Sequence, residues 1–226
     1  MCRSRPLWHE NYQFRTWAIK LLLATTNPGK LAELKQGFLG KNFELVTLTL
    51  YDNIGKPEET GKTFKENALL KAKFYAEKTG LPIIADDGGI EIDFLNGEPG
   101  VLSRRWPGHE ATDEELIRYT LTKLDKVPVQ KRGAQLSACL CFLNPQTKKT
   151  KFVQESVRGI IASKPSEERI EGFPYRALFV VDAYKKYYDE LTPQEHNEIN
   201  HRLKAVKRIS DVILSYPSSP PLIGEE

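Results

Sequence analysis

Long hydrophobic runs are missing from this chain of 226 residues. No apolar stretch approaches the roughly 18 residues that a membrane-spanning helix needs. The segment 1–20 contains arginines, but Trp8, His9, Glu10 and Asn11 interrupt any apolar stretch, which argues against a secretory signal. We therefore expect a water-soluble, cytoplasmic protein with no membrane partner.

A strong charge of one sign is also missing. The 33 lysines and arginines nearly balance the 30 aspartates and glutamates, and the formal net charge is only +3. A nucleic-acid-binding surface would show clustered Lys and Arg, so we expect no nucleic-acid partner. A pocket for one phosphorylated small molecule needs only a few cations, and this composition allows it.

Cysteine is scarce. The chain has three, at Cys2, Cys139 and Cys141. Cys139 and Cys141 are two apart in an apolar run, where alternation places both on one face, and further zinc ligands at suitable spacing are lacking. We interpret them as small core residues of a protein kept in a reducing compartment.

Short apolar runs and capping signals predict a mixture of strands and helices. Helices are expected to begin near Lys30, Thr63, Thr112 and Thr192, the last three at capping boxes, and the final helix is expected to carry Ile199 and Ile213 on one face. The predicted strands are 20–25, 43–50, 81–85, 134–143, 151–161 and 178–181. Because the elements mix without strict alternation, we expect an α/β domain over 20–215 whose sheet has parallel and antiparallel parts. Residues 1–19 are expected to form an extension and residues 216–226 a disordered tail.

A polar turn, Thr25-Thr26-Asn27-Pro28-Gly29-Lys30, lies between a buried strand and a helix. Free N–H groups at a helix N-terminus favour anions, and Lys30 adds a positive charge. The turn therefore predicts a phosphate site, although an ordinary turn capped by Asn27 would have the same sequence. It lacks the Walker A spacing.

Two adjacent carboxylates, Asp86 and Asp87, follow a predicted buried strand. Neighbours on a strand point in opposite directions, so one can face a cleft while the other braces the loop. With Glu58 and Glu59 they suggest an oxygen-only magnesium site, since Mg²⁺ is usually held by one or two carboxylates plus substrate phosphates. A solvated acidic turn is the alternative. It is less attractive because the following Gly88 and Gly89 would let a ligand approach the backbone closely.

Two segments near the C-terminus are less specific. Asn200-His201-Arg202, with His196 before it, falls on the predicted last helix, where a surface position is the more common explanation. The loop Glu171-Gly172-Phe173-Pro174-Tyr175 can stack on a base or simply form a packed turn.

Taken together, these segments resemble the inosine triphosphate pyrophosphatase family, whose members clear inosine and xanthosine triphosphates from nucleotide pools. The resemblance runs from Lys20 to about Leu214. It rests on the strings ATTNPGKLAEL, EETGKTFKENALLKA, PIIADDGGIEIDFLNGEPGVLSRRW, EGFPYRALF and NHRLKAV. The resemblance implies a long mixed sheet flanked by helices, two lobes around a substrate cleft, and a homodimer.

The resemblance also implies roles for particular residues. Asp87 matches the metal ligand and water-activating base, Glu58 matches a second metal-associated acid, and Lys30 matches the cation of the phosphate-binding turn. Mg²⁺ is the implied cofactor and a nucleoside triphosphate the implied substrate. The predicted substrate-binding residues are Thr25, Thr26, Asn27, Pro28, Gly29, Lys30, Gly88, Phe173, Pro174, Tyr175, Arg176, His196, His201 and Arg202.

The chain departs from the family pattern mainly in the part that would hold the base. Gly88 replaces a serine, Pro174 and Arg176 stand where GFGYD has glycine and aspartate, His196 replaces a lysine, and Asn200 replaces the serine of SHR. The leading hypothesis is hydrolysis of a nonstandard purine nucleoside triphosphate to the monophosphate and pyrophosphate. The alternative is a nucleotide-binding protein of the same fold with impaired catalysis or altered base specificity.

Overall fold

A computed structural model describes residues 18–215, and its centre is one seven-stranded sheet in the order β2-β1-β3-β4-β5-β6-β7. The predicted extension 1–19 and tail 216–226 lie outside this range, except that Ile19 already belongs to β1. The strands are β1 Ile19–Ala24, β2 Phe43–Thr47, β3 Ile83–Ile92, β4 Gly133–Asn144, β5 Lys149–Ile161, β6 Phe179–Val181 and β7 Lys186–Tyr187. The helices are α1 Pro28–Phe38, α2 Phe64–Thr79, α3 Asp113–Lys123, α4 Pro193–Ile199 and α5 His201–Leu214.

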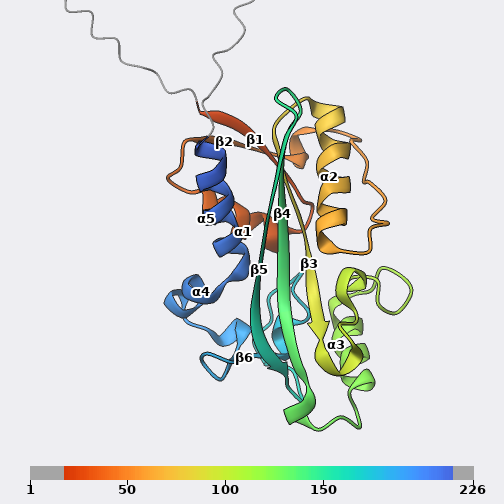
Figure 1. The fold of residues 1–226 in the computed structure, drawn as a ribbon. Helices are drawn as coiled ribbons and strands as arrows, with labels where there is room; N and C mark the ends of the chain where they lie inside the picture. Colours follow the sequence, from red (N-terminus) through yellow and green to blue (C-terminus); the bar gives the residue numbers. More distant parts are fainter. Residues whose placement is uncertain (1–17, 216–226) are drawn as a thin grey trace, which may run out of the picture.

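The sheet is mixed, as predicted. β1 pairs in parallel with β2 and β3, whereas all later pairs are antiparallel. The long strands β3, β4 and β5 run through the whole length of the molecule and join an upper and a lower half (Figure 1). Because β1 pairs with β3 only as far as Ala24 and Ala85, the sheet opens just beyond this point.

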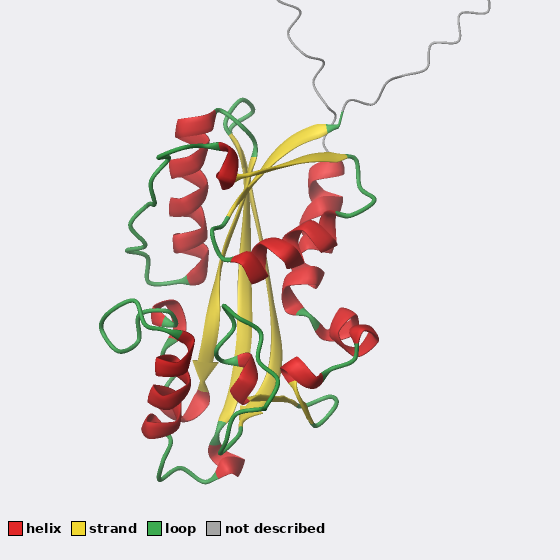
Figure 2. Cartoon of the chain, turned by 180° about the vertical axis from the view of Figure 1, so that it is seen from behind, coloured by secondary structure: helices red, strands yellow, loops and turns green. Residues whose placement is uncertain are grey.

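Helices cover both faces of the upper half, because alternate residues of the strands point to opposite sides. Leu21 and Leu23 pack with α1 and α5 on one face, while Leu22 and Ala24 pack with α2 on the other (Figures 1 and 2). The lower half has its own apolar cluster, in which the end of β3 packs with α3 and β6. No described helix is long and apolar enough to cross a membrane.

The prediction that the third strand ends at Ala85 is wrong. β3 continues to Ile92, so Asp86 and Asp87 lie inside a strand and are paired with Leu140 and Cys139 of β4. The next residue, Gly88, is required by this pairing, because a Cβ there would overlap the carbonyl oxygen of Ser137. Two carboxylates can remain inside a sheet because each has a cationic partner, described below.

The last helix is also divided, where the sequence predicted one element. α4 ends at Ile199 and α5 begins at His201, because the side chain of Asn200 accepts from the backbone N–H groups of Arg202 and Leu203 and so caps α5.

The predicted capping boxes at Thr112 and Thr192 are confirmed. At Thr63 only half of the box forms. Thr63 accepts from the N–H of Glu66, but the Glu66 carboxylate accepts from the N–H of Lys62 instead of Thr63.

Candidate active site

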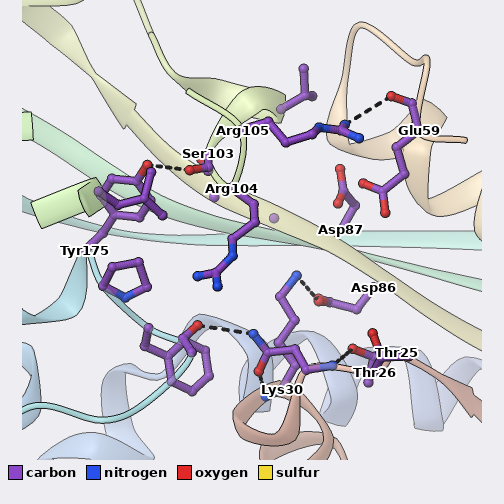
Figure 3. A pocket seen from close by; sticks show the side chains of 18 of the residues that line it. Thr25, Thr26, Lys30, Glu59, Asp86, Asp87, Ser103, Arg104, Arg105 and Tyr175 are labelled. Atoms are coloured by element: carbon purple, nitrogen blue, oxygen red, sulfur yellow. Dashed lines mark hydrogen bonds and ion pairs between the residues drawn. The ribbon is translucent and has the colours of Figure 1, made fainter. Parts of the chain in front are cut away.

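A cavity of about 850 Å³ lies between the two halves, a size typical of small-molecule sites. It is bounded by the turn before α1, the middle of β3, the start of α3, the junction of α4 and α5, and three loops (Figure 3). The predicted residues that line it are Thr25, Thr26, Asn27, Pro28, Lys30, Asp87, Gly88, Phe173, Pro174, Tyr175, Arg176, His201 and Arg202.

The turn before α1 both caps the helix and faces the cavity. Asn27 Oδ1 accepts from the N–H of Lys30 at 3.0 Å, and its Nδ2 donates to the carbonyl of Gly172 at 3.1 Å. The two interpretations of this turn are therefore compatible. Gly29 was predicted to bind substrate, but it does not line the cavity. It packs under the ring of Phe173, and a Cβ there would overlap that ring.

Asp86 and Asp87 point to opposite sides of β3, as expected for neighbours on a strand. Asp86 is buried between Lys30, whose Nζ lies 2.7 Å from Oδ2, and Arg202, whose Nε lies 3.1 Å from Oδ1. Burial alone would raise the pKa of Asp86, but the charges of Arg202 and Lys30 outweigh it and hold the pKa well below its usual range. Asp86 therefore stays ionised and fixes the ammonium of Lys30.

Asp87 faces Lys71, whose Nζ lies 2.8 Å from Oδ1 and 3.3 Å from Glu59 Oε1. Burial raises the pKa of Asp87, and the nearby charges of Lys71 and Lys30 only partly offset this effect. Among the described residues, the buried Oδ2 atom has no hydrogen-bond partner. Asp87 thus offers one free oxygen at the cavity wall, held in place through the other.

The carboxylate beside this group is Glu59 and not the predicted Glu58. Glu58 is exposed, whereas Glu59 lines the cavity (Figure 3) and its Oε1 is the atom paired with Lys71. Arg105 also donates to the backbone carbonyl of Glu59 at 3.3 Å, which fixes the loop in this orientation.

A buried ion-pair network centred on Glu33 of α1 joins this helix to the loop 171–176 and to the start of α5. Glu33 accepts from Arg176 at 2.7 Å, from Arg202 at 2.6 Å and from Asn200 at 2.6 Å. Burial would raise the pKa of Glu33, but Arg176 and Arg202 lower it to about 2. Arg176 therefore points inward, not to solvent, and its positive charge is balanced.

The loop 171–176 has two aromatic rings at the cavity, and only that of Phe173 is partly exposed. The guanidinium of Arg176 lies 3.6 Å from the centre of the Phe173 ring, a cation–π contact that holds the ring. Tyr175 lies deeper, and its hydroxyl donates to the carbonyl of Ser103 at 2.5 Å (Figure 3). Phe173 is the partly exposed ring of the two, and therefore the better platform for a base.

The two predicted histidines have different environments. His201 lines the cavity, its Nδ1 is buried with no hydrogen-bond partner among the described residues, and burial together with Arg202 lowers its pKa, so the ring is neutral. His196 does not line the cavity. It lies 3.2 Å from Asn200 and packs edge-on against Tyr188, because the chain turns between α4 and α5 and removes it from the helix face that carries His201.

The donor set around Asp87 fits a hard divalent cation only in part. Within residues 18–215, no group of three His, Cys, Asp or Glu side chains is placed to hold a metal ion. The unpartnered Asp87 Oδ2 and the nearby Glu59 are oxygen donors suited to an ion that takes its remaining ligands from substrate phosphates and water.

Comparisons with known proteins find related sequences and a related solved structure. The model of the Ham1 family matches residues 21–212. The dITP/XTP pyrophosphatase of Yersinia pseudotuberculosis is 40% identical over 195 residues, which cover 86% of this chain and 98% of that protein. The dITP/XTP pyrophosphatase of Thermus thermophilus is 39% identical over 203 residues, 90% of this chain and 94% of that protein. The solved HAM1 protein from Coxiella burnetii is 34% identical with a TM-score of 0.78, and the match covers 88% of this chain and all of that one (100%).

Proposed function

This chain belongs to the Ham1 family, and we propose that it hydrolyses nonstandard purine nucleoside triphosphates to the monophosphate and pyrophosphate. Similarity to proteins named dITP/XTP pyrophosphatase along almost their whole length supports this substrate class. The observation that carries the proposal is that Lys30 and Asp87 line one cavity of suitable size.

Lys30 and Asp87 are the proposed catalytic residues. Lys30, held by Asp86, would bind the phosphate chain together with the N–H groups at the start of α1, so that the chain is oriented before reaction. Asp87 would orient the attacking water and take its proton. Lys71 keeps the Asp87 carboxylate in place for this role.

Mg²⁺ is the proposed cofactor, held by Asp87 Oδ2, with Glu59 in place of Glu58 as the nearby acid. Bound there, the ion would neutralise charge on the phosphates. Homodimer formation and a cytoplasmic location remain predictions from the sequence.

The base would stack on Phe173, near the neutral His201 and the arginines of the Glu33 network. A neutral imidazole can donate or accept a hydrogen bond, so it can read a base edge without adding charge. Of the rebuilt positions, Pro174 and Arg176 line the cavity beside Phe173 and Asn200 bonds to Glu33, so these three can alter which base is accepted, whereas Gly88 lies next to Asp87 in β3.

A substrate panel tests the proposal. Purified protein with Mg²⁺ is expected to release pyrophosphate from inosine or xanthosine triphosphate faster than from the four standard triphosphates. Asp87→Asn should lower the rate about 10²- to 10⁴-fold, the usual contribution of a positioned base. Asp125→Asn, at an exposed aspartate, is the matched control and should retain the rate. Full activity of Asp87→Asn would refute the assigned role, and binding of triphosphates without turnover in the wild type would favour the binding-protein alternative.

A further inference from the structure

Arg104 lines the cavity, yet the proposed reaction gives it no role. It follows the turn Gly100–Leu102, on the wall opposite the turn that carries Lys30. In Figure 3 its guanidinium points into the cavity, toward the side from which the Lys30 ammonium enters. Its Nη1 is paired with Asp113 Oδ1 at 2.5 Å, and 48% of the Arg104 side chain is exposed.

The ion-paired cations of this cavity fall into two groups. Lys30, Lys71, Arg176 and Arg202 are each paired with a carboxylate that is almost fully buried, so separating them would leave an uncompensated charge in the interior. The pair of Arg104 and Asp113 is partly exposed, and such pairs contribute little to stability. Arg104 can therefore leave its partner at low cost.

The charge of Asp113 is stabilised by groups other than Arg104. It is the first residue of α3, where the helix dipole favours a negative charge. Its Oδ2 accepts from the N–H of Gly172 at 2.7 Å, in the loop that carries Phe173. If Arg104 moved away, Asp113 would keep both stabilising interactions.

We propose that Arg104 is a phosphate-binding residue that exchanges Asp113 for the phosphate oxygens of a bound nucleoside triphosphate. The planar guanidinium can donate two parallel hydrogen bonds to phosphate oxygens, whereas a lysine ammonium acts as a point charge without this fixed geometry. It would meet the phosphate chain from the wall opposite Lys30. The identity of the ligand rests on the proposed function, whereas the exchange itself rests on the geometry of Arg104 and Asp113.

Equilibrium binding in the presence of a chelator tests the proposal without turnover. Inosine triphosphate and inosine are titrated into the full-length protein by calorimetry. Arg104→Ala is expected to weaken triphosphate binding roughly 10- to 100-fold, the range for a hydrogen-bonded charge, and to change inosine binding less than about 2-fold. Arg104→Lys should recover part of the loss. Arg158→Ala removes an arginine of the same 48% exposure that is paired with Asp93 outside the cavity, and it should bind both ligands like the wild type.

Asp113→Asn separates exchange from a structural role. The amide still accepts from Gly172 but no longer competes for Arg104, so triphosphate binding should be equal to or tighter than in the wild type. If Asp113→Asn weakens binding as Arg104→Ala does, or if Arg104→Ala binds like Arg158→Ala, the proposal is wrong. If the wild type releases pyrophosphate but Arg104→Ala binds the triphosphate normally, only this inference is refuted. If the wild type binds the triphosphate through Arg104 but releases no pyrophosphate, only the proposed function is refuted. If the wild type binds no triphosphate, both are refuted.

Discussion

Glu33 connects three side chains that lie more than 140 positions away in the sequence. Its carboxylate balances two buried arginines, so the position of each depends on the others. Nothing in the pattern around Glu33 distinguishes it from a solvated residue on the first helix. Only the packing of α5 and the loop 171–176 against α1 gives it its partners.

The Glu33 carboxylate predicts how stability depends on pH. The pKa of Glu33 is lowered to about 2 in the folded protein. The ionised carboxylate therefore contributes fully to the free energy of unfolding above the pKa that Glu33 has in the unfolded chain, and this contribution is lost as the pH falls toward 2. The difference from the ordinary value corresponds to about 3 kcal/mol at pH 7. Glu33→Gln should lower the free energy of unfolding by about this amount at pH 7 and by much less near pH 2, in urea titrations at both pH values.

Glu44→Gln is the control, since Glu44 forms an exposed pair with Lys20 and should change stability little. A Glu33→Gln effect that stays constant from pH 7 to pH 2 would contradict the linkage.

Sequence patterns locate the residues whose chemistry is local but not those defined by distant contacts. Asp86, Asp87 and Lys30 stand out in the sequence because the two aspartates follow a short apolar run and the lysine lies near a helix start signal. Lys71 belongs to the helix string ENALLKA, where it looks like one charge among several, and its role follows only from its position opposite Asp87. Glu58 and Glu59 cannot be distinguished from their spacing, because the direction of a side chain in an irregular loop depends on its contacts.

The ends of helices and strands can likewise be predicted where the signal is local, but not where it depends on distant contacts. The caps at Thr112 and Thr192 could be predicted because a capping box is contained in four consecutive residues. The extension of β3 through two aspartates could not, because pairing with β4 and two distant cations outweighs the low strand propensity of aspartate. The break between α4 and α5 likewise depends on Glu33, which holds the amide of Asn200.

Asn200 provides a test at this scale. It caps α5 and donates to Glu33, and it is fully buried. Asn200→Ala should cost about 2–4 kcal/mol, which combines a lost cap with a lost hydrogen bond to a charged group. Asn200→Ser can still cap the helix and should recover about 1 kcal/mol of this loss. Urea unfolding of the three proteins measures both differences, and equal stability of the Ser and Ala variants would argue against the cap.

Within the described range 18–215, the three apolar clusters are built from residues 19–213. A chain of residues 18–215 is therefore expected to fold by itself. Its melting temperature should lie within about 2 °C of the full chain, because a difference of about 0.5 kcal/mol moves Tm by no more than this at such a size. Its pyrophosphate release should match as well. A clear loss of either in calorimetry or activity assays would show that the remaining residues contribute to the folded domain.

The α/β class and the mixed sheet were predictable from the sequence, since the runs that form β1, β3, β4 and β5 are apolar and well separated. The order of the strands was not, because it depends on which hydrophobic faces meet.

The position of Asp86 and Asp87 within a fully paired strand has a consequence for how the protein can diverge. The reactive carboxylates are fixed by the sheet, whereas the residues around the base belong to a loop and a helix junction at its margin. Substitutions at this margin can accumulate without moving the two aspartates. A lineage could thus acquire a new nucleobase preference while retaining the chemistry of phosphate cleavage unchanged.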